Sequence, residues 1–401
     1  MRRHRCLRRP SWLVGALVTG VLLGACGIGS SDAAAPSGTR SPSPSGASAP
    51  ATSRSDSTAG HDAGKPPLTG LIDMGVQNAY QQGAPFPTTD PSTLDAYAGA
   101  FGGIVVNEAW SQLEPSFGVE DWAPLDRSLA AVRTWNAQHP STPLGVKLRI
   151  FAGYSAPLWV VRESGPPVTI ESGRHRLLTR TMGRWWTAAF RRAWHGFQRA
   201  LAARYDTNPL IRAVSVSSCS SITGEPFVVS ARPATRLALR AAGWTVQRQE
   251  SCLEGALSDY SGWTHTEVTF AFNPLLTASG PDAAFTIRIM QECAASKASG
   301  GPDCVLGNND LSAAAPNEKG PAPVYSEIAA LVARGPRPPS VYFQTVGAGV
   351  DCQAMAVAAE HHAGSVELWP PNAGYRGFAA IPVATLAGWN QALVERTPIT
   401  C

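Results

Sequence analysis

The chain has 401 residues, of which 44% are hydrophobic, and it carries 33 Lys and Arg against 29 Asp and Glu, a formal net charge of +4 at pH 7. Five arginines lie within the first nine residues, and without them 28 basic residues (33 less 5) face 29 acidic ones, a net charge of −1. The excess positive charge therefore belongs to the start of the chain, and the rest carries no basic footprint for nucleic acid. These arginines are Arg2, Arg3, Arg5, Arg8 and Arg9.

The first 25 residues have the pattern of an export signal. The basic head MRRHRCLRRP precedes the apolar stretch SWLVGALVTGVLL, which is too short to span a bilayer comfortably. Leu23-Gly24-Ala25-Cys26 then resembles the lipobox of a bacterial lipoprotein. The resemblance implies that residues 1–25 are a lipoprotein signal peptide, that Cys26 is acylated, and that the protein is anchored at the extracellular face of the cell membrane. With an ordinary cleaved signal, the alternative, the protein is secreted.

Residues 26–66 are rich in Ser, Ala, Pro and Gly and almost free of large apolar side chains. Such a segment cannot bury enough surface to offset its chain entropy. We therefore expect a disordered linker that holds the following domain at a distance from the membrane.

Cysteine usage is typical of an exported protein. Cys6 lies in the signal and Cys26 at the lipid site, which leaves six cysteines in the folded part. No two have CxxC spacing and the histidines are not spaced as zinc ligands, so we expect disulfides, with no metal and no cofactor. We favour pairing between neighbours in the sequence, because each bond would tie the end of a strand or helix to an adjacent connection: Cys219 with Cys252, Cys293 with Cys304, and Cys352 with Cys401.

Residues 67–401 have the size of one large α/β barrel. Eight apolar runs alternate with amphipathic helical segments such as 124–140 and 185–205. No Gly-rich phosphate loop follows any of the runs, so the pattern predicts a single (β/α)8 TIM barrel rather than an open doubly wound sheet. The runs are GLIDMGV, GGIVVNEAW, LGVKLRIFAG, IRAVSVSS, TEVTFAFNP, CVLGNNDL, SVYFQTVG and SVELWP.

Active sites of such barrels lie at the carboxyl ends of the strands. The polar and aromatic residues there suit a carbohydrate, because sugar faces stack on aromatic rings and sugar hydroxyls need amide and carboxylate partners. Cleavage of a glycosidic bond usually needs two carboxyl groups. In chain order the strand-end residues are Asp73, Asn107, Glu108, Trp110, Arg149, Glu225, Asn273, Asn308, Asp310, Gln344, Glu367 and Trp369.

The segments VVNEAWSQLEPSFGVEDWAPLD and VKLRIFAGYSAPLWV resemble the second and third strand units of clan A glycoside hydrolases, especially beta-galactosidase-type members. The resemblance implies that Glu225, which follows the fourth strand in SITGEPF, is the acid/base. It places the nucleophile at the end of the seventh strand, where this chain has Gln344. An amide cannot form a glycosyl-enzyme intermediate.

Three hypotheses address the missing nucleophile. Glu367 alternates with Val366 and Leu368, and so points into the barrel, where it is either the second carboxylate, suited to an inverting reaction, or a structural partner of Arg149. Asp310 or Glu108 is the second choice as base. In the third hypothesis hydrolysis is lost and only sugar binding remains.

The sequence therefore predicts an exported glycoside hydrolase-like protein with Glu225 as general acid and Glu367 as its partner. The alternative is a catalytically inactive, polysaccharide-binding surface lipoprotein. The expected ligand is an oligo- or polysaccharide, and the protein is expected to be a monomer. The substrate-binding residues would be Asn107, Glu108, Trp110, Arg149, Trp159, Asn273, Asp310, Gln344 and Trp369.

Overall fold

The computed structural model describes residues 65–75, 85–172, 178–224, 226, 232–277, 280–334, 338–346, 350–371 and 377–401. The expected signal, Cys26 and all but the end of the linker lie outside the described residues, and so does Glu225. The barrel belongs to a compact unit that runs from His61 to Cys401.

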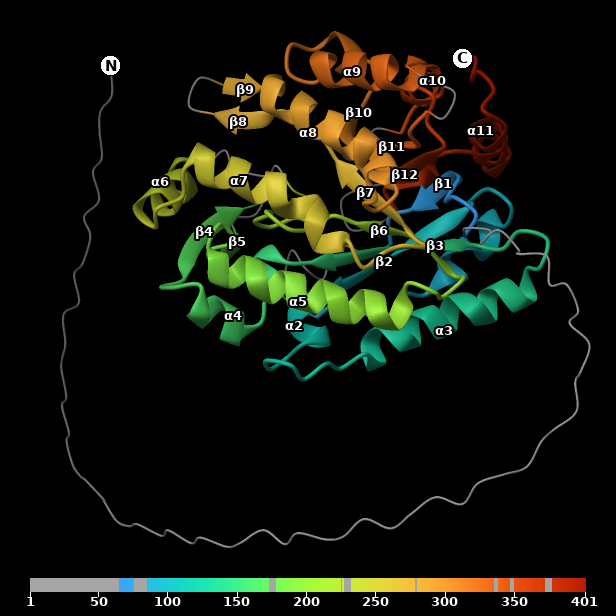
Figure 1. Cartoon of the computed structure of the whole chain (residues 1–401). Helices are drawn as coiled ribbons and strands as arrows, with labels where there is room; N and C mark the ends of the chain where they lie inside the picture. Colours follow the sequence, from blue (N-terminus) through green and yellow to red (C-terminus); the bar gives the residue numbers. More distant parts are fainter. Residues whose placement is uncertain are drawn as a thin grey trace, which may run out of the picture. The chain divides into compact units, whose positions relative to one another are not determined.

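Eight parallel strands form a closed barrel in the order β1-β12-β11-β10-β7-β6-β3-β2 (Figure 1). Pairing of β1 with both β2 and β12 closes the ring. All eight predicted apolar runs supply barrel strands, so the predicted (β/α)8 fold is confirmed. The strands are β1 (Gly70–Asp73), β2 (Gly103–Ala109), β3 (Gly145–Phe151), β6 (Ile211–Ser215), β7 (Glu267–Ala271), β10 (Cys304–Leu311), β11 (Val341–Thr345) and β12 (Ser365–Leu368).

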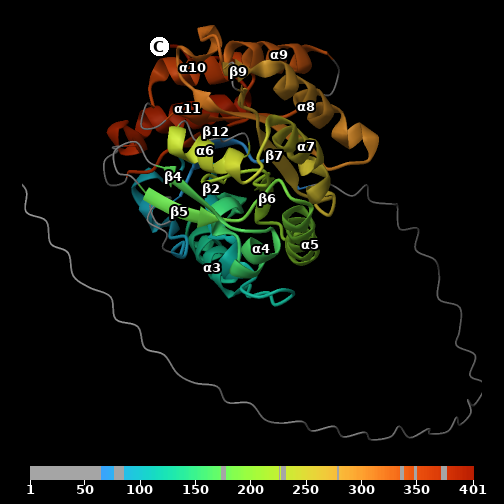
Figure 2. The same ribbon diagram turned by 90° about the vertical axis from the view of Figure 1, so that its left-hand side faces the viewer.

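Long helices surround the strands (Figure 2). Several begin at a side chain that accepts a hydrogen bond from the first turn: Thr187 caps α5, Asp282 caps α8 and Asp351 caps α10. Their apolar faces pack on the barrel, as the helical periodicity predicts. These helices are α3 (Ala123–Gln138), α5 (Ala188–Tyr205), α7 (Val246–Ala256), α8 (Ala283–Ser296), α9 (Ala322–Ala333), α10 (Cys352–Glu360) and α11 (Val383–Glu395).

Further elements, which the alternation of apolar runs and helical segments did not predict, are inserted between the barrel units. Two hairpins, β4–β5 (Val168–Ser172 and Leu178–Met182) and β8–β9 (Leu275–Thr277 and Gly280–Asp282), follow β3 and β7. Helix α6 (Pro233–Ala241) is held to β4 because Thr235 exchanges hydrogen bonds with the backbone of Glu171. The remaining short helices are η1 (Pro91–Tyr97), α2 (Trp110–Leu113), η2 (Gly153–Ser155), α4 (Leu158–Glu163), η3 (Leu257–Tyr260), η4 (Lys297–Ser299), η5 (Ala315–Asn317) and η6 (Gly377–Ala380).

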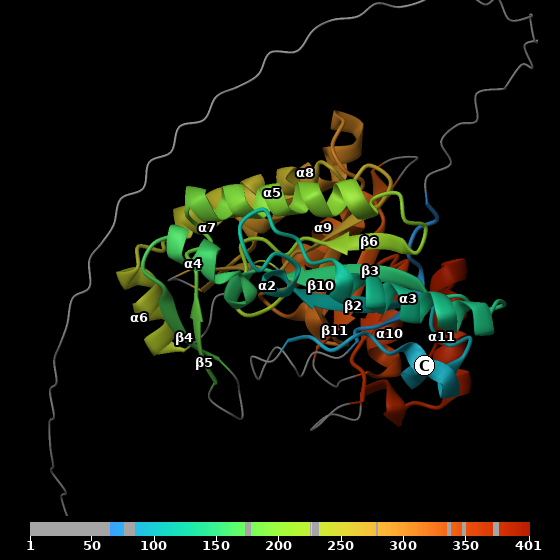
Figure 3. The ribbon, with the colours of Figure 1, turned by 90° about the horizontal axis from the view of Figure 1, so that it is seen from below.

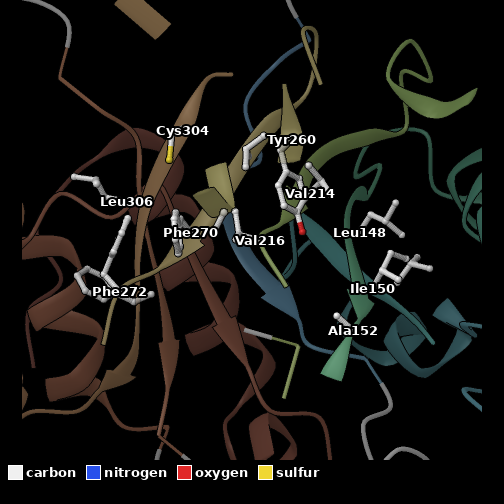
Figure 4. Packing of buried hydrophobic residues seen from close by; sticks show 14 of the residues in the cluster. Leu148, Ile150, Ala152, Val214, Val216, Tyr260, Phe270, Phe272, Cys304 and Leu306 are labelled. Carbon is white, nitrogen blue, oxygen red and sulfur yellow. The ribbon is translucent and has the colours of Figure 1, made fainter. Parts of the chain in front are cut away.

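The barrel strands are buried on both faces, which explains why they are nearly continuous apolar runs. One face of each strand packs against the helices, as Leu148, Val214 and Phe270 do in the main core (Figure 4). The side chains on the other face fill the barrel interior, where they form separate small apolar clusters. One cluster consists of Leu68, Ile72, Val105 and Ala213, and another of Ala271, Val305 and Tyr342.

Three disulfides join Cys219 to Cys252, Cys293 to Cys304, and Cys352 to Cys401. The predicted pairing of sequence neighbours is therefore confirmed. The first ties the loop after β6 to α7, the second ties α8 to the start of β10, and the third ties the start of α10 to the last residue of the sequence.

Within the described residues, no helix combines the length and the apolar character that crossing a bilayer requires.

Candidate functional site: the barrel mouth and interior

The barrel interior holds an ion-pair cluster of three side chains. Glu367 on β12 accepts hydrogen bonds from Lys147 Nζ through Oε1 and from Arg149 Nη2 through Oε2. The ammonium of Lys147 also lies 3.6 Å from the centre of the Tyr342 ring, a cation–π contact. Lys147 and Arg149 both point inward because they are two residues apart on one strand, β3. We call Lys147, Arg149 and Glu367 the interior ion cluster.

The Glu367 carboxylate is only 1% exposed. Burial opposes its ionisation, but the charges of Arg149 and Lys147, and the hydrogen bonds they donate, outweigh burial and hold the pKa of Glu367 below its usual value. Glu367 and Lys147 line a narrow cavity whose other walls include Leu68, Gly364 and Ser365, at or before the starts of strands. The inward direction of Glu367 is confirmed, and the carboxylate takes part in the structural pairing with Arg149.

Gln344 lies beside Glu367, because β11 pairs with β12 in the register Gln344 to Glu367. The side chain is buried, with 7% exposed. The structure therefore puts an amide at the position on the seventh barrel strand that the resemblance assigns to a nucleophile. The neighbouring carboxylate belongs to the interior ion cluster.

The loop that leads to Glu225 packs closely on the end of β3. A Cβ on Gly224 would lie 2.6 Å from Cδ of Arg149, and a Cβ on Gly153 would lie 1.9 Å from the carbonyl oxygen of Ser221. The amide of Tyr154 donates a hydrogen bond of 2.9 Å to that same oxygen. Glycine at 153 and 224 permits this approach, so the residue that precedes Glu225 in the sequence lies against Arg149 at the barrel mouth.

A second set of contacts holds the start of this loop. Cys219 has a positive φ of 62° and is bonded to Cys252 of α7. Its carbonyl oxygen accepts a hydrogen bond of 2.9 Å from Gln249, whose own side-chain oxygen accepts from the Trp185 ring nitrogen. The disulfide and the hydrogen bond therefore attach the segment that precedes Glu225 to α7.

Glu108 points away from the mouth, toward α3. Ser128 donates a hydrogen bond of 3.2 Å to its Oε1, and its Oε2 is buried without a hydrogen-bond partner among the described residues. Burial raises the pKa of Glu108 to about 8, partly offset by Ser128 and by the charge of Arg127. A carboxyl between strand and helix has no route to a glycan at the mouth, so this placement supports neither substrate contact nor a role as base.

Asp73 and Asn107 line a pocket beside the mouth, between the ends of β1 and β2 and the segments around Thr89 and Pro370. The Asn107 amide donates to the carbonyl oxygen of Met74 at 2.8 Å, and the Gly75 amide donates to Asp73 at 2.9 Å. Burial raises the pKa of Asp73 to about 7. The walls formed by Thr89 and Pro370 were missed from the sequence, because nothing local marks loops that meet only in the fold.

Asn273, Asn308 and Asp310 join the ends of β7 and β10. The Asn308 amide donates to the Phe272 carbonyl at 2.7 Å and to Asn273 Oδ1 at 3.2 Å, and it accepts from the Asp310 backbone amide at 2.8 Å. Burial, with a contribution from the charge of Glu318, raises the pKa of Asp310. Asn308 is buried and structural, whereas Asn273 and Asp310 keep part of their surface exposed.

The three tryptophans expected as sugar platforms differ in exposure. Trp110 is 0% exposed, packs among Phe190, Trp194 and Phe197, and therefore offers no face to a ligand. Trp159 and Trp369 are half-buried. Trp159 meets the exposed ring of Phe117 at 5.1 Å between ring centres, and Trp369 donates a 2.8 Å hydrogen bond to the Thr345 carbonyl.

No group of three or more His, Cys, Asp or Glu side chains suited to a metal ion occurs among the residues that the structure describes.

No family model and no curated protein matches this chain. Among solved structures, endo-glycoceramidase II from Rhodococcus sp. in complex with a five-membered iminocyclitol is similar over 76% of this chain and 74% of that chain, with 17% identity and a TM-score of 0.43. Its lactosyl-enzyme intermediate has 16% identity and a TM-score of 0.44 over the same shares. Similarity at this level carries no argument about function. The closed order of eight parallel strands establishes the barrel.

Proposed function

We propose that this protein is an exported glycan-binding barrel that holds its ligand at the barrel mouth and does not hydrolyse it through a Glu225–Glu367 pair. The observation that carries the proposal is the interior ion cluster. The Glu367 carboxylate is bound by Lys147 and Arg149 and is only 1% exposed, so it is not available to a glycan at the mouth. With Gln344 beside it, the last two barrel strands supply no carboxylate to the mouth.

The half-buried rings of Trp159 and Trp369 support a carbohydrate as the ligand, because the flat apolar face of a sugar stacks on such rings. The partly exposed Asn273 and Asp310 add groups that pair with sugar hydroxyls. The motifs of residues 103–161 that resemble clan A glycoside hydrolases favour the same ligand class. Display outside the cell, through an acyl group on Cys26, belongs to the proposal.

Hydrolysis is the second candidate, and the tight attachment of the loop before Glu225 favours it. A disulfide, the Gln249 hydrogen bond and the approach of Gly224 to Arg149 all fix this loop, as a positioned catalytic acid would require. The partner would then be a carboxyl such as Asp310, which is partly exposed and has a raised pKa.

The test is a glycan array followed by titration of any hit, with product release measured in parallel. The purified chain from residue 27 onward would be compared with Glu225→Gln and Trp369→Ala. The proposal predicts saturable binding without bond cleavage, weakened in Trp369→Ala. Turnover that disappears in Glu225→Gln would establish the second candidate instead.

A further inference from the structure

At the opposite end of the barrel, a groove is lined by arginines from three elements. Arg133 lies on α3, Arg204 at the end of α5 and Arg212 on β6, with Asn136, Leu144 and residues 207–210 as the remaining walls. Figure 3 shows α3 and α5 running beside β3 and β6, and the groove lies where those strands begin. We call it the arginine groove.

Arg212 has an unusual environment. A Cβ on Gly145 would lie 2.8 Å from Cδ of Arg212, so the glycine leaves room for the arginine side chain across the start of β3. Its Nε is buried with no hydrogen-bond partner among the described residues, and burial lowers its pKa. A half-buried cation loses part of its hydration, and an anionic partner compensates for this loss.

The carboxylates of the described residues neutralise only one of the three arginines in the groove. Asp126 pairs with Arg204 at 2.8 Å, and Asp206 is occupied by Thr264 and His265. Among the described residues, no carboxylate forms an ion pair with Arg133 or Arg212. Two guanidinium groups thus remain for an external anion, and the planar guanidinium suits the oxygens of a phosphate.

The chain enters the barrel at the same face. Lys65, at the end of the expected linker, donates hydrogen bonds of 2.8 Å to the Ile211 carbonyl and 2.7 Å to Thr266 Oγ1. Ile211 directly precedes Arg212 in the sequence. Lys65, from which the chain leads back toward Cys26, is therefore attached next to the arginine groove. An acyl anchor on Cys26 would therefore be connected, through the expected linker, to the face of the barrel that carries the arginine groove.

We infer that the arginine groove binds the phosphates of anionic phospholipids in the membrane that carries the anchor, and that this contact turns the barrel mouth away from the membrane. The arginine groove and the entry of the chain lie at the strand starts, whereas the proposed glycan site lies at the strand ends. The inference therefore rests on the proposed acyl anchor and not on the proposed glycan site. Juxtamembrane Lys and Arg side chains each favour binding to an anionic leaflet, and salt screens the attraction.

The test is cosedimentation of residues 27–401, which lack the expected signal and acyl site, with vesicles of phosphatidylglycerol and phosphatidylcholine or of phosphatidylcholine alone. Arg133→Gln with Arg212→Gln should weaken binding to the anionic vesicles about 30-fold. Arg236→Gln with Arg240→Gln on α6 removes the same charge from exposed positions elsewhere and should leave binding unchanged. Thermal unfolding checks that each variant is folded, and Arg133→Glu, at an exposed helix position, repeats the test without altering Arg212.

Equal binding of the groove variants and the unchanged protein to anionic vesicles would overturn the inference. It would also be overturned if inorganic phosphate raised the melting temperature through Arg133 and Arg212 while the vesicles were not bound, because the site would then serve a free anion rather than a membrane.

Discussion

Glu367 on β12 and Lys147 on β3 form a buried ion pair inside the barrel, and Arg149 completes it from the same strand as Lys147. Because the pair joins strands that are not neighbours in the ring, it ties two sides of the barrel together. The carboxylate of this pair, Glu367, is the group that the sequence predicts as the catalytic partner of Glu225. The pairing argues for a structural role.

Replacing Glu367 by glutamine should therefore reduce stability before it affects any ligand. The change leaves Lys147 and Arg149 buried without their shared carboxylate, and such losses cost about 3–5 kcal/mol. Urea unfolding measures the difference. Glu254→Gln, which breaks a surface pair with Arg288, is the matched control and should cost less than about 1 kcal/mol. A fully stable Glu367→Gln variant would contradict the structural role.

Glu108 should make the protein less stable as the pH rises from about 4.5 to 8. Burial raises the pKa of Glu108 in the folded protein from its usual 4.5 to about 8, so the folded state holds a proton that the unfolded state has released. The stability present below the unfolded pKa is lost as the pH rises through the folded pKa, on the order of 5 kcal/mol. Glu108→Gln imitates the protonated form and should flatten this part of the melting-temperature profile. An unchanged profile would mean that Glu108 is ionised in the folded protein.

The disulfide between Cys219 and Cys252 should matter for binding as well as for stability. Replacing both cysteines by serine should cost about 2–4 kcal/mol and release the loop before Glu225, which weakens glycan binding. Replacing Cys352 and Cys401 is the control, because that bond fastens the end of the chain far along the sequence from this loop. Similar losses of affinity in both double variants would show that the Cys219 loop has no special part in the site.

Gln344→Glu tests whether the barrel lacks only a nucleophile. Glutamate has nearly the shape of glutamine, so the side chain fits, and the resemblance puts a carboxylate at this position. The variant should gain hydrolysis of an activated aryl glycoside, and adding Glu225→Gln should lower that gain about 100-fold or more. No activity in a folded Gln344→Glu variant would show that the mouth differs from a glycosidase in more than this residue.

The fold was predictable because parallel barrel strands, buried on both faces, leave continuous apolar runs in the sequence. The disulfides followed because neighbouring cysteines lie at the ends of consecutive elements. The hairpins β4–β5 and β8–β9 were missed, because their short strands carry no such run and their positions depend on contacts with the barrel units, as between β4 and α6.

For the site, period-two alternation was the informative signal. It correctly put Glu367 inward with Val366 and Leu368 toward the helices. The same rule applied to IVVNEAW puts Glu108 on the helix side with Ile104 and Val106. The prediction of Glu108 as a site residue considered only its place at the end of the strand and not this alternation. The inward direction of Lys147 was predictable in the same way, because Lys147 lies two residues before Arg149 in an apolar strand. The exposure of each tryptophan depends on tertiary packing, and no local pattern distinguishes Trp110 from Trp369.

The most direct test of the account is simultaneous measurement of binding and bond cleavage for one glycan identified on the array, by calorimetric titration and by release of reducing ends. The account predicts saturable binding with no release of reducing ends, by the unchanged protein and by a folded Glu367→Gln variant alike. Release of reducing ends that a folded Glu367→Gln variant abolishes would contradict it, because Glu367 would then act in the reaction and not only in the interior ion cluster.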